Sequence, residues 1–531
     1  MEDELGTCKD ITRELRNSSL SPLNRLCSIV YDASFVDRIV SLLPSKLPVG
    51  GNWRAGRWYV RAEKASFECC FKSADGHYGQ WNFSFWRNNL QLLRLLFAKG
   101  GAVVVDTTRQ GKRFPDSLSK TIPIWCFIIN TVLGDFGVWR EDNCNNTVCL
   151  PEWVPKEERH WILERSKKWL TMIREHEEFQ SVLLELVSEY SVRKPLKPIW
   201  LSRDQPHIEQ VLSELVNISF IPVLCVSVSS PNDNQSWLTH SLKSGETYGF
   251  RYIQGAGDDE ESWSCGLFPE LFWRYEEELL STDTALIKEC IKDLLERVKS
   301  VPASIGKFSR HMGHIQVLRA GGAEEHTKNG VDLFWGGWVS MEFLPLLYPY
   351  CIDVHIVLSV GYRNSPLIDG LPTVLSKFGD TCQVVCVNVV DRAGRLESKR
   401  FGLERALKQV FHYLDYFLQK KNNVMIWCPF DTDWSTCCVL TWLALRSTAK
   451  HPLKIVKEDN RLDQQIWLVD WERQETLEDK TALITLFWWL SLSFDLHAPS
   501  RSSVQQMHRF LWGDKRALQK MTLGGNFEAP K

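Results

Sequence analysis

Short runs of apolar, mostly β-branched residues, each followed by a polar loop, constrain the fold of this chain more than any other feature. One run, Gly101–Val105, ends at Asp106 and opens into a loop that carries Arg109. Continuous apolar runs of this length are typical of buried strands. Further runs of the same character are residues 220–229, 354–360, 383–390 and 424–427. Amphipathic stretches at residues 157–190, 269–299 and 403–418 predict helices. The combination predicts an α/β fold.

The length of the chain, 531 residues, predicts about two to four domains. We expect a first α/β region over residues 1–345, of one or two subdomains. A second α/β domain is expected over residues 346–531, with a mostly parallel sheet flanked by helices. In the first region Pro48–Gly51 is expected to be flexible, and Arg193–Pro198 to be a connection that two prolines interrupt. The longest apolar run, near Ile484–Phe494, is too short to span a bilayer and predicts a buried helix.

Composition limits the kinds of partner and compartment. The formal net charge is −2, so binding to nucleic acid through bulk positive charge is excluded, and any basic surface must be local. The 16 cysteines follow a polar N-terminus without a signal sequence, which predicts free thiols in the reducing cytoplasm. Neither Cys144–Cys149 nor Cys382–Cys386 has a second pair at zinc-finger spacing, so we expect no structural zinc.

The segment Cys428–Ser435 follows a predicted strand and precedes a predicted helix that begins at Ser435. This layout resembles the phosphate loop of dual-specificity cysteine phosphatases, in which an arginine follows the cysteine after five residues. Trp434 occupies the arginine position here, and Asp431 and Asp433 would oppose both a thiolate and a bound phosphate. Phosphatase chemistry is therefore disfavoured. Two alternatives remain. In one, an inherited scaffold persists and Asp433 and Ser435 cap the helix. In the other, the carboxylates hold Mg²⁺ or accept protons from hydroxyl groups, with Cys428, Asp433 and Ser435 as candidate donor contacts.

Several long motifs point to one family. They are Phe71–His77, Trp81–Ser84, Val105–Trp125, Gln254–Trp263 and Ser502–Leu511. This set resembles the initiator tRNA 2′-O-ribosyl-phosphate transferase family of fungi and plants, and the likeness runs from about Arg61 to Leu511. One position departs from the family pattern, because Asp431 stands where the cysteine loop of the family usually has glycine.

The resemblance implies a specific reaction. Such enzymes use 5-phosphoribosyl-1-pyrophosphate (PRPP) with Mg²⁺. They attach its phosphoribosyl group to the ribose 2′-OH of the purine at position 64 of initiator tRNA-Met, which keeps this tRNA out of elongation. The resemblance implies initiator tRNA and PRPP as partners, with neither DNA nor a membrane. The sequence indicates no oligomeric state.

The loop after Asp106 carries the groups that such a transfer needs. Cations must neutralise the pyrophosphate, and negative charge must face the developing ribose cation. Arg109, Lys112 and Arg113 are predicted to neutralise phosphates. The remaining candidates are Gly111, for close backbone approach, Asp106 and Asp116, for Mg²⁺ or the ribose, and Ser119 and Lys120, for the donor. The alternative is a solvated basic turn whose aspartates cap neighbouring structure.

A second candidate group lies about 150 residues later in the sequence. Asp258 and Asp259 follow a glycine-rich turn and are predicted to hold Mg²⁺–pyrophosphate or ribose hydroxyls, with Gln254 and Gly255 contacting the donor. The alternative is an exposed acidic loop. His77 is a candidate general base or RNA contact, although a lone histidine is more often structural.

Binding of tRNA should rely on backbone and shape, because an A-form helix hides its major-groove edges. The candidate phosphate contacts are Arg193, Lys194, Lys197, Lys399, Arg400, Lys420 and Lys421. Two other functions remain open from sequence. One is a catalytically inactive, phosphatase-like tRNA-binding scaffold, and the other is a phosphatase.

Overall fold

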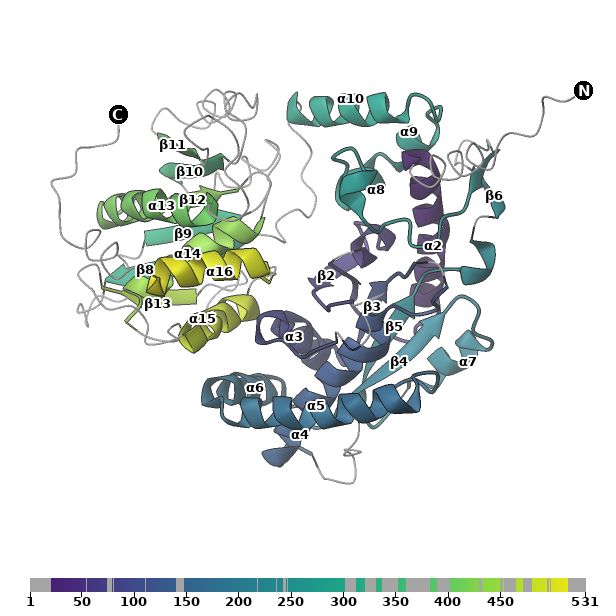
Figure 1. Cartoon of the computed structure of the whole chain (residues 1–531), viewed down its shortest axis with the longest axis horizontal. Coiled ribbons are helices and arrows are strands. Elements are labelled where there is room, and N and C mark those ends of the chain that lie inside the picture. Colours follow the sequence, from purple (N-terminus) through teal and green to yellow (C-terminus); the bar gives the residue numbers. More distant parts are fainter. Residues whose placement is uncertain are drawn as a thin grey trace, which may run out of the picture. The chain divides into compact units, whose positions relative to one another are not determined.

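The chain divides into two compact units, Met1–Arg297 and Val298–Lys531, in a computed structural model of the protein (Figure 1). The residues that the structure describes are 21–53, 55–73, 79, 81–109, 111–139, 148–216, 218–234, 236–241, 245, 247–300, 312–319, 331–336, 352–359, 383–388, 402–428, 432–448, 452, 465–470, 480–493, 496 and 498–513.

The first unit is built on a five-stranded parallel sheet. Its strands are β1 (Val49–Asn52), β2 (Ala65–Cys69), β3 (Ala102–Asp106), β4 (Leu196–Ser202) and β5 (Ile221–Ser227). The spatial order is β2-β1-β3-β5-β4, and every neighbouring pair is parallel. All carboxyl ends therefore meet at one edge. Because the chain passes from β1 to β2 on one side and then to β3 on the other, β1 and β3 form a topological switch point, where ligands bind in such folds.

Helices cover this sheet and complete its core. They are α2 (Pro22–Leu42), α3 (Leu90–Lys99), the π-helical turn η3 (Ser117–Thr121) that continues as α4 (Ile122–Asp135), α5 (Lys156–Arg174), α6 (Glu177–Tyr190) and α7 (Ile208–Ser213). α3 packs on β2, β3 and β5, whereas α4 packs on β4, and α5 and α6 lie over these two helices. The strands β3 and β5 are buried along their whole length, which confirms the interpretation of their apolar runs.

Strand β1 contradicts the expectation that Pro48–Gly51 is flexible. A Cβ atom on Gly50 would lie 2.4 Å from the backbone oxygen of Phe67, and one on Gly51 would lie 2.4 Å from the backbone nitrogen of Arg57. Glycine is therefore required by close packing within a strand, not by a loop. The glycine pair suggested flexibility because sequence alone does not show what approaches the backbone.

Strand β4 corrects the second expectation about connections. Residues Arg193–Pro198 were predicted to link two elements, but Leu196–Ser202 is a strand that pairs in parallel with β5 alone. A proline donates no hydrogen bond, and an edge strand tolerates this on its open side. Pro198 therefore marks an edge strand.

One helix of the first unit is long and apolar enough to cross a membrane by length and composition alone. It runs from Ser117 to Asp135, and 72% of its most apolar window is buried within the structure. It packs against β4 and α5, as a core helix does.

The shorter apolar helix α15 (Lys480–Ser493) of the second unit confirms the buried helix expected near 484–494, since Leu483, Leu486 and Trp488 are fully buried.

Smaller elements complete the first unit. They are the short turns η1 (Gly56–Tyr59), η2 (Phe85–Arg87), η5 (Pro231–Asp233) and η6 (Glu260–Ser262), the antiparallel hairpin β6 (Trp237–Ser241) and β7 (Thr247–Arg251), and the helices α8 (Pro269–Arg274), α9 (Glu276–Leu280) and α10 (Ile287–Ser300). The segment between β7 and η6 returns to the carboxyl edge of the sheet and contributes to the candidate site.

The second unit is also α/β. Its strands are β8 (Met312–Arg319), β9 (Val331–Gly336), β10 (Val354–Ser359), β11 (Gln383–Asn388), β12 (Val424–Trp427) and β13 (Gln465–Val469). They form a sheet in the order β11-β10-β12-β9-β8-β13, parallel except between β8 and β9. Its helices are α13 (Gly402–Gln419), α14 (Thr432–Arg446), α15 and α16 (Arg501–Trp512). The α/β class predicted for both regions is confirmed.

The predicted boundary near residue 345 is wrong. The division lies between Arg297 and Val298, because β8 and β9 hydrogen-bond into the second sheet. Both strands precede residue 345, in a glycine-rich stretch whose pattern gave no clear element. Their long-range pairing with β12 and β13, not their local sequence, assigns them to the second unit.

Candidate functional site

The candidate site lies at the switch point, where β1 ends at Asn52 and β3 ends at Asp106. Asp106 is fully buried, and the side-chain amide of Asn52 donates to its Oδ2 over 2.8 Å. The backbone N–H of Thr107 donates to Oδ1 over 2.8 Å, and the Ser117 hydroxyl donates to Oδ2. Asp106 thus lies beneath the following loop and positions it. Its predicted direct contact with Mg²⁺ or ribose stays a prediction.

The loop that follows β3 is hydrogen-bonded to residues at the carboxyl end of β5. The hydroxyls of Thr107 and Ser229 are 2.7 Å apart, and the Ser229 hydroxyl also receives the backbone N–H of Thr108 over 2.9 Å. Ser227 donates its hydroxyl to the carbonyl of Arg113 over 2.6 Å. Gly111 adopts a φ of +86°, which glycine allows without strain. These bonds hold Thr107, Thr108 and Arg113 in place relative to the sheet.

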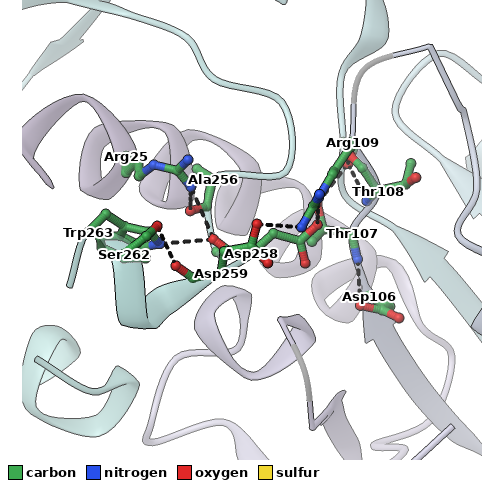
Figure 2. Close-up of polar contacts among 12 residues, drawn as sticks. Arg25, Asp106, Thr107, Thr108, Arg109, Ala256, Asp258, Asp259, Ser262 and Trp263 are labelled. Carbon is green, nitrogen blue, oxygen red and sulfur yellow. Dashed lines mark hydrogen bonds and ion pairs between the residues drawn. The ribbon is translucent and has the colours of Figure 1, made fainter. Parts of the chain in front are cut away.

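Arg109 joins the two groups that the sequence placed far apart. Its Nε lies 3.1 Å from Asp258 Oδ2, and its Nη2 lies 2.5 Å from Asp259 Oδ2 (Figure 2). The Asp258 carboxylate is almost fully buried, whereas the side chains of Arg109 and Asp259 are 55% and 64% exposed. The site therefore has a buried negative charge, an exposed negative charge and a cation between them.

The acidic turn is held in place from below by Arg25. This residue lies on α2, and its Nη1 donates to the carbonyl of Ala256 over 2.7 Å and to that of Asp258 over 3.2 Å (Figure 2). Its guanidinium stacks 5.6 Å from the Trp263 ring, and the Trp263 indole N–H donates to the Asp258 carbonyl over 3.0 Å. Burial lowers the pKa of Arg25. Sequence reasoning missed Arg25, because no local motif marks a helix residue that contacts a turn more than 200 positions away.

Tyr59 and Glu260 support the same turn. The backbone N–H of Gly257 donates to the Tyr59 hydroxyl over 2.8 Å, and a Cβ on Gly257 would lie 3.1 Å from the Tyr59 ring. Burial raises the pKa of Tyr59, so this hydroxyl stays neutral. Glu260 accepts the indole N–H of Trp58 over 2.7 Å and pairs with Arg57 over 2.5 Å. The turn is thus preorganised by residues that do not reach its exposed face.

Asp259 is presented to solvent by an unusual backbone conformation. Its φ is +51°, in the left-handed region, which aspartate tolerates better than most residues. Residues held in such conformations occur often at functional sites. The following residues continue directly into η6, so the exposed carboxylate lies at the start of a helical turn.

Gln254 and Gly255 connect the acidic turn to the cationic loop. The Gln254 side-chain amide donates to the carbonyl of Lys112 over 2.8 Å, and its Oε1 is buried with no hydrogen-bond partner among the described residues. Gly255 has a φ of +70°, and a Cβ there would lie 3.0 Å from the carbonyl oxygen of Thr108. Both residues predicted to contact the donor therefore lie where the two loops meet.

The remaining cations of the loop point to other partners. Lys112 Nζ lies 3.5 Å from Asp116 Oδ1, and Lys120 Nζ lies 3.1 Å from the same oxygen. Lys120 also pairs with buried Glu158 over 2.8 Å. Ser119 is buried and donates its hydroxyl to Pro115 over 2.9 Å. Asp116, Ser119 and Lys120 thus have partners inside the fold, and their predicted contacts with the donor stay predictions.

Arg113 is directed toward the end of β4. Its Nε donates to the Ser202 hydroxyl over 2.8 Å and lies 3.0 Å from Asp204 Oδ1. Its side chain is 40% exposed. Of the three loop cations predicted to neutralise phosphates, Arg109 contacts the acidic pair, while Lys112 lies beside Asp116 and Arg113 beside Ser202.

Metal binding at this site would depend on the substrate. Among the described residues, no group of three or more His, Cys, Asp or Glu side chains gathers as a metal site. Mg²⁺ usually binds one or two carboxylates and completes its shell with substrate phosphates and water. Asp258 and Asp259 fit that smaller requirement, and Arg109 is their counter-charge.

The cysteine loop belongs to the second unit. Cys428 is buried directly after β12, and α14 begins at Thr432, three residues before the predicted start at Ser435. The Asp433 carboxylate accepts the Ser500 backbone N–H over 2.9 Å and the Ser503 hydroxyl over 2.7 Å. Asp433 therefore ties the start of α16 to α14, and Ser435 is buried inside the helix. An acidic residue in the first turn of a helix is itself stabilising, which explains the earlier start.

Some of the predicted residues lie outside the described residues, and others lie away from the candidate site. His77, Asp431, Lys399 and Arg400 lie outside the described residues. Arg193, Lys194 and Lys197 lie at the amino end of β4, at the sheet edge opposite the candidate site. Lys194 donates to the carbonyl of Ile218 over 2.7 Å, and Lys197 lies 4.7 Å from the Phe220 ring. These three residues do not join the site; Lys420 and Lys421 belong to the second unit.

Residues 15–296 match the family model described as the Rit1 N-terminal domain, which is more than half of the chain. The chain belongs to this family. The matched segment contains the switch point, the loop after β3 and the acidic turn. Family membership, predicted from the motifs, is therefore confirmed.

Two curated relatives each match more than half of this Rit1-family chain. An uncharacterized protein of Schizosaccharomyces pombe is 34% identical over 305 residues, which cover 57% of this chain and 63% of that protein. The tRNA A64-2′-O-ribosylphosphate transferase of Saccharomyces cerevisiae is 31% identical over 290 residues, which cover 51% of this chain and 53% of that enzyme. The alignments thus span less than two thirds of either relative.

Among solved structures, a leucine-rich repeat and phosphatase domain containing protein from Entamoeba histolytica matches 37% of this chain and 91% of its own, with 13% identity and a TM-score of 0.20. The phosphatase likeness of the second unit accordingly stays a prediction.

Proposed function

We propose that this Rit1-family chain transfers the 5-phosphoribosyl group of PRPP to the ribose 2′-OH of the purine at position 64 of initiator tRNA-Met. The observation that carries the proposal is the contact of Arg109 with Asp258 and Asp259 at the switch point of the family-matched unit. The related yeast enzyme named for ribosylphosphate transfer to tRNA A64 supports the choice of reaction.

The charges at the site suit both halves of PRPP. In the transfer, the bond between ribose C1 and the pyrophosphate oxygen breaks, and a bond from C1 to the tRNA 2′-oxygen forms. Arg109 is exposed enough to exchange its carboxylate partners for the departing pyrophosphate. The freed carboxylates would then face the ribose as positive charge develops on it. The contacts of Arg109 with the two carboxylates would thus be replaced by two separate interactions with the donor.

Mg²⁺ bound with PRPP would offset charge on the pyrophosphate and help it leave. Asp258 and Asp259 are the residues that would hold it. The 2′-OH of tRNA loses its proton during the transfer, and Asp259 is an exposed carboxylate of the turn that could accept a hydroxyl proton. His77 remains a second candidate for this base.

The alternative, a catalytically inactive phosphatase-like tRNA-binding scaffold, gives no reason for a preorganised acidic turn with an exposed cation beside it. A cytoplasmic location is part of the proposal, since initiator tRNA acts there and the many cysteines suit a reducing compartment.

The direct test is transfer of radiolabel from PRPP carrying ³²P on its 5′-phosphate to purified initiator tRNA in the presence of Mg²⁺. An elongator tRNA is the control. Label on initiator tRNA alone supports the reaction and its selectivity. Labelling of both tRNAs would remove initiator selectivity from the proposal, and labelling of neither, by protein that binds tRNA, would favour the scaffold.

A further inference from the structure

An exposed indole lies on a rigid turn next to the cationic loop of the candidate site. Trp153 is 50% exposed, whereas many of the described tryptophans, such as Trp125 and Trp263, are buried. One face of its ring is covered by Phe114, with the ring centroids 4.9 Å apart and the planes at 22°. Phe114 is itself buried and follows Arg113 in the loop after β3. Trp153 therefore presents a flat exposed face, and the buried Phe114 ring supports its other face.

Further contacts fix the orientation of this ring. Trp200 of β4 approaches the edge of Trp153 with a centroid distance of 6.2 Å and a plane angle of 77°. The Trp200 indole N–H is bonded to the carbonyl of Leu118 over 2.8 Å. Arg159 donates to the carbonyls of Leu150, Pro151 and Val154, which encloses the turn that carries Trp153. An aromatic side chain held this firmly loses little entropy when a ligand stacks on it.

Two partly exposed cations lie on the loop that supports the ring, and each is paired with a carboxylate, Asp204 or Asp116, that a phosphate could replace. The Arg113 guanidinium lies 5.9 Å from the Phe114 ring and is 40% exposed, and the neighbouring Lys112 is 41% exposed. The loop with both cations is also bonded to the acidic turn, through Gln254 and the Lys112 carbonyl. A polymer that stacked on Trp153 would place its phosphates beside these cations and would lie along the same loop as Arg109.

We propose that Trp153 is a stacking platform for an unpaired nucleobase of the tRNA substrate. Flat aromatic surfaces bordered by cations bind single-stranded bases, because every base has a π-face and every nucleotide carries a phosphate. A fully paired A-form stem exposes no such face along its length, so the base comes from a loop or an end. The platform gives a second point of attachment beside the acidic turn. This inference rests on the proposed function for the choice of tRNA as ligand.

The test compares tRNA affinity of the full-length wild type and three variants at one salt concentration. Trp153→Ala should bind initiator tRNA roughly tenfold more weakly, whereas Trp153→Phe should bind close to wild type because it keeps a flat ring. The matched control is Trp237→Ala, since Trp237 is 75% exposed on β6 and should not affect binding. Should Trp153→Ala fail to fold, Trp153→Leu keeps apolar contact with Phe114 but removes the flat ring.

A blunt, fully paired RNA duplex separates stacking from a general loss of binding. Wild type and Trp153→Ala should bind the duplex equally. The slope of log affinity against log salt on tRNA should also be unchanged, because the indole carries no charge. Equal affinities of the two proteins for tRNA would overturn the platform, as would equal losses on tRNA and duplex.

The proposed transfer and the platform can fail separately. If wild type binds tRNA but transfers no phosphoribosyl group, the transferase proposal fails. The tRNA affinities of wild type and the Trp153 variants then still test whether Trp153 stacks on a base. If wild type transfers the group and Trp153→Ala binds tRNA normally, the platform alone fails. Absence of tRNA binding by the wild type would overturn both.

Discussion

At the scale of single residues, the site depends on which charges are free to exchange partners. Asp258 is buried beside Arg109, and the contact spans 149 positions of sequence. The Arg109 side chain is 55% exposed, so its guanidinium can release one carboxylate without leaving a buried position. A phosphate-bearing donor would compete for this cation through charge-assisted hydrogen bonds.

Replacement of Arg109 tests this exchange. Arg109→Ala should lower kcat/KM for PRPP by about 100-fold, because a charge-assisted bond to the leaving group is lost and Asp258 remains buried without its cation. Steady-state transfer to initiator tRNA measures the effect. Arg174→Ala is the matched control, since Arg174 is similarly exposed and pairs with Asp135 elsewhere in the unit. Equal loss in both variants would contradict a specific role for Arg109.

A buried carboxyl near the site should give stability an unusual pH dependence. Burial raises the pKa of Asp32 well above its ordinary value, against the opposing effect of Arg203 at 3.9 Å. Tyr252 donates to both Asp32 oxygens over 2.9 and 3.0 Å, and Asp233 adds a nearby negative charge. The folded state therefore keeps a proton that the unfolded state has released. Stability from this group is lost as pH rises from the ordinary carboxyl pKa through the raised one.

Asp32→Asn should remove this dependence, because its amide needs no proton to stay neutral. The free energy of unfolding of the variant minus that of wild type should be larger at pH 8 than at pH 4.5, by at least about 1 kcal/mol. Urea unfolding at the two pH values measures this. Parallel pH curves for variant and wild type would show that Asp32 does not titrate as the structure indicates.

At the scale of elements, the strands that sequence predicted are those with continuous β-branched runs. β3, β5, β10, β11 and β12 were all expected within a few residues of their observed bounds. β1 and β4 were missed, because Gly50, Gly51 and Pro198 give local signals of loops. Only the neighbouring backbone and the edge position explain these residues. The missed strand β1 also carries half of the switch point.

The glycine requirement in β1 makes a clear prediction. Gly50→Ala should destabilise the first unit by roughly 2–3 kcal/mol or more, since the new methyl group would meet Phe67 at 2.4–2.6 Å. Thermal or urea unfolding measures the loss. Gly137→Ala is the comparison, because nothing lies within 4 Å of a Cβ there and the cost comes only from its positive φ. A smaller loss at Gly50 than at Gly137 would contradict the packing argument.

The second unit has a buried histidine in a central strand. Burial lowers the pKa of His355 on β10 to about 4, so the folded state keeps it neutral. The unfolded chain takes up a proton below about pH 6.5, and stability of this unit is therefore lost as pH falls from that value toward 4. His355→Leu should reduce this loss by roughly 2–3 kcal/mol. Unfolding followed at pH 7 and pH 4.5 tests it, and an unchanged pH dependence would contradict it.

At the scale of the whole molecule, the sequence predicted the α/β class, family membership and the two charged segments of the candidate site. It did not predict that Arg109 contacts Asp258 and Asp259, or that Asp116 and Lys120 pair within the fold. It also missed Arg25, whose contacts with the acidic turn arise only when α2 packs against it. Motifs therefore identified the chemistry, and tertiary packing decided which residues share a site.

We propose that the first unit carries out the transfer and that Cys428 of the second unit takes no part in its chemistry. The most direct test measures phosphoribosyl transfer from labelled PRPP to initiator tRNA by wild type, Asp258→Asn and Cys428→Ser, with Glu261→Gln as a control in the same acidic turn. We predict that Asp258→Asn loses at least about 100-fold in kcat/KM, while Cys428→Ser and Glu261→Gln transfer the label at rates near wild type. Full activity in Asp258→Asn, with loss of activity in folded Cys428→Ser, would contradict the assignment and place the reaction at the cysteine loop.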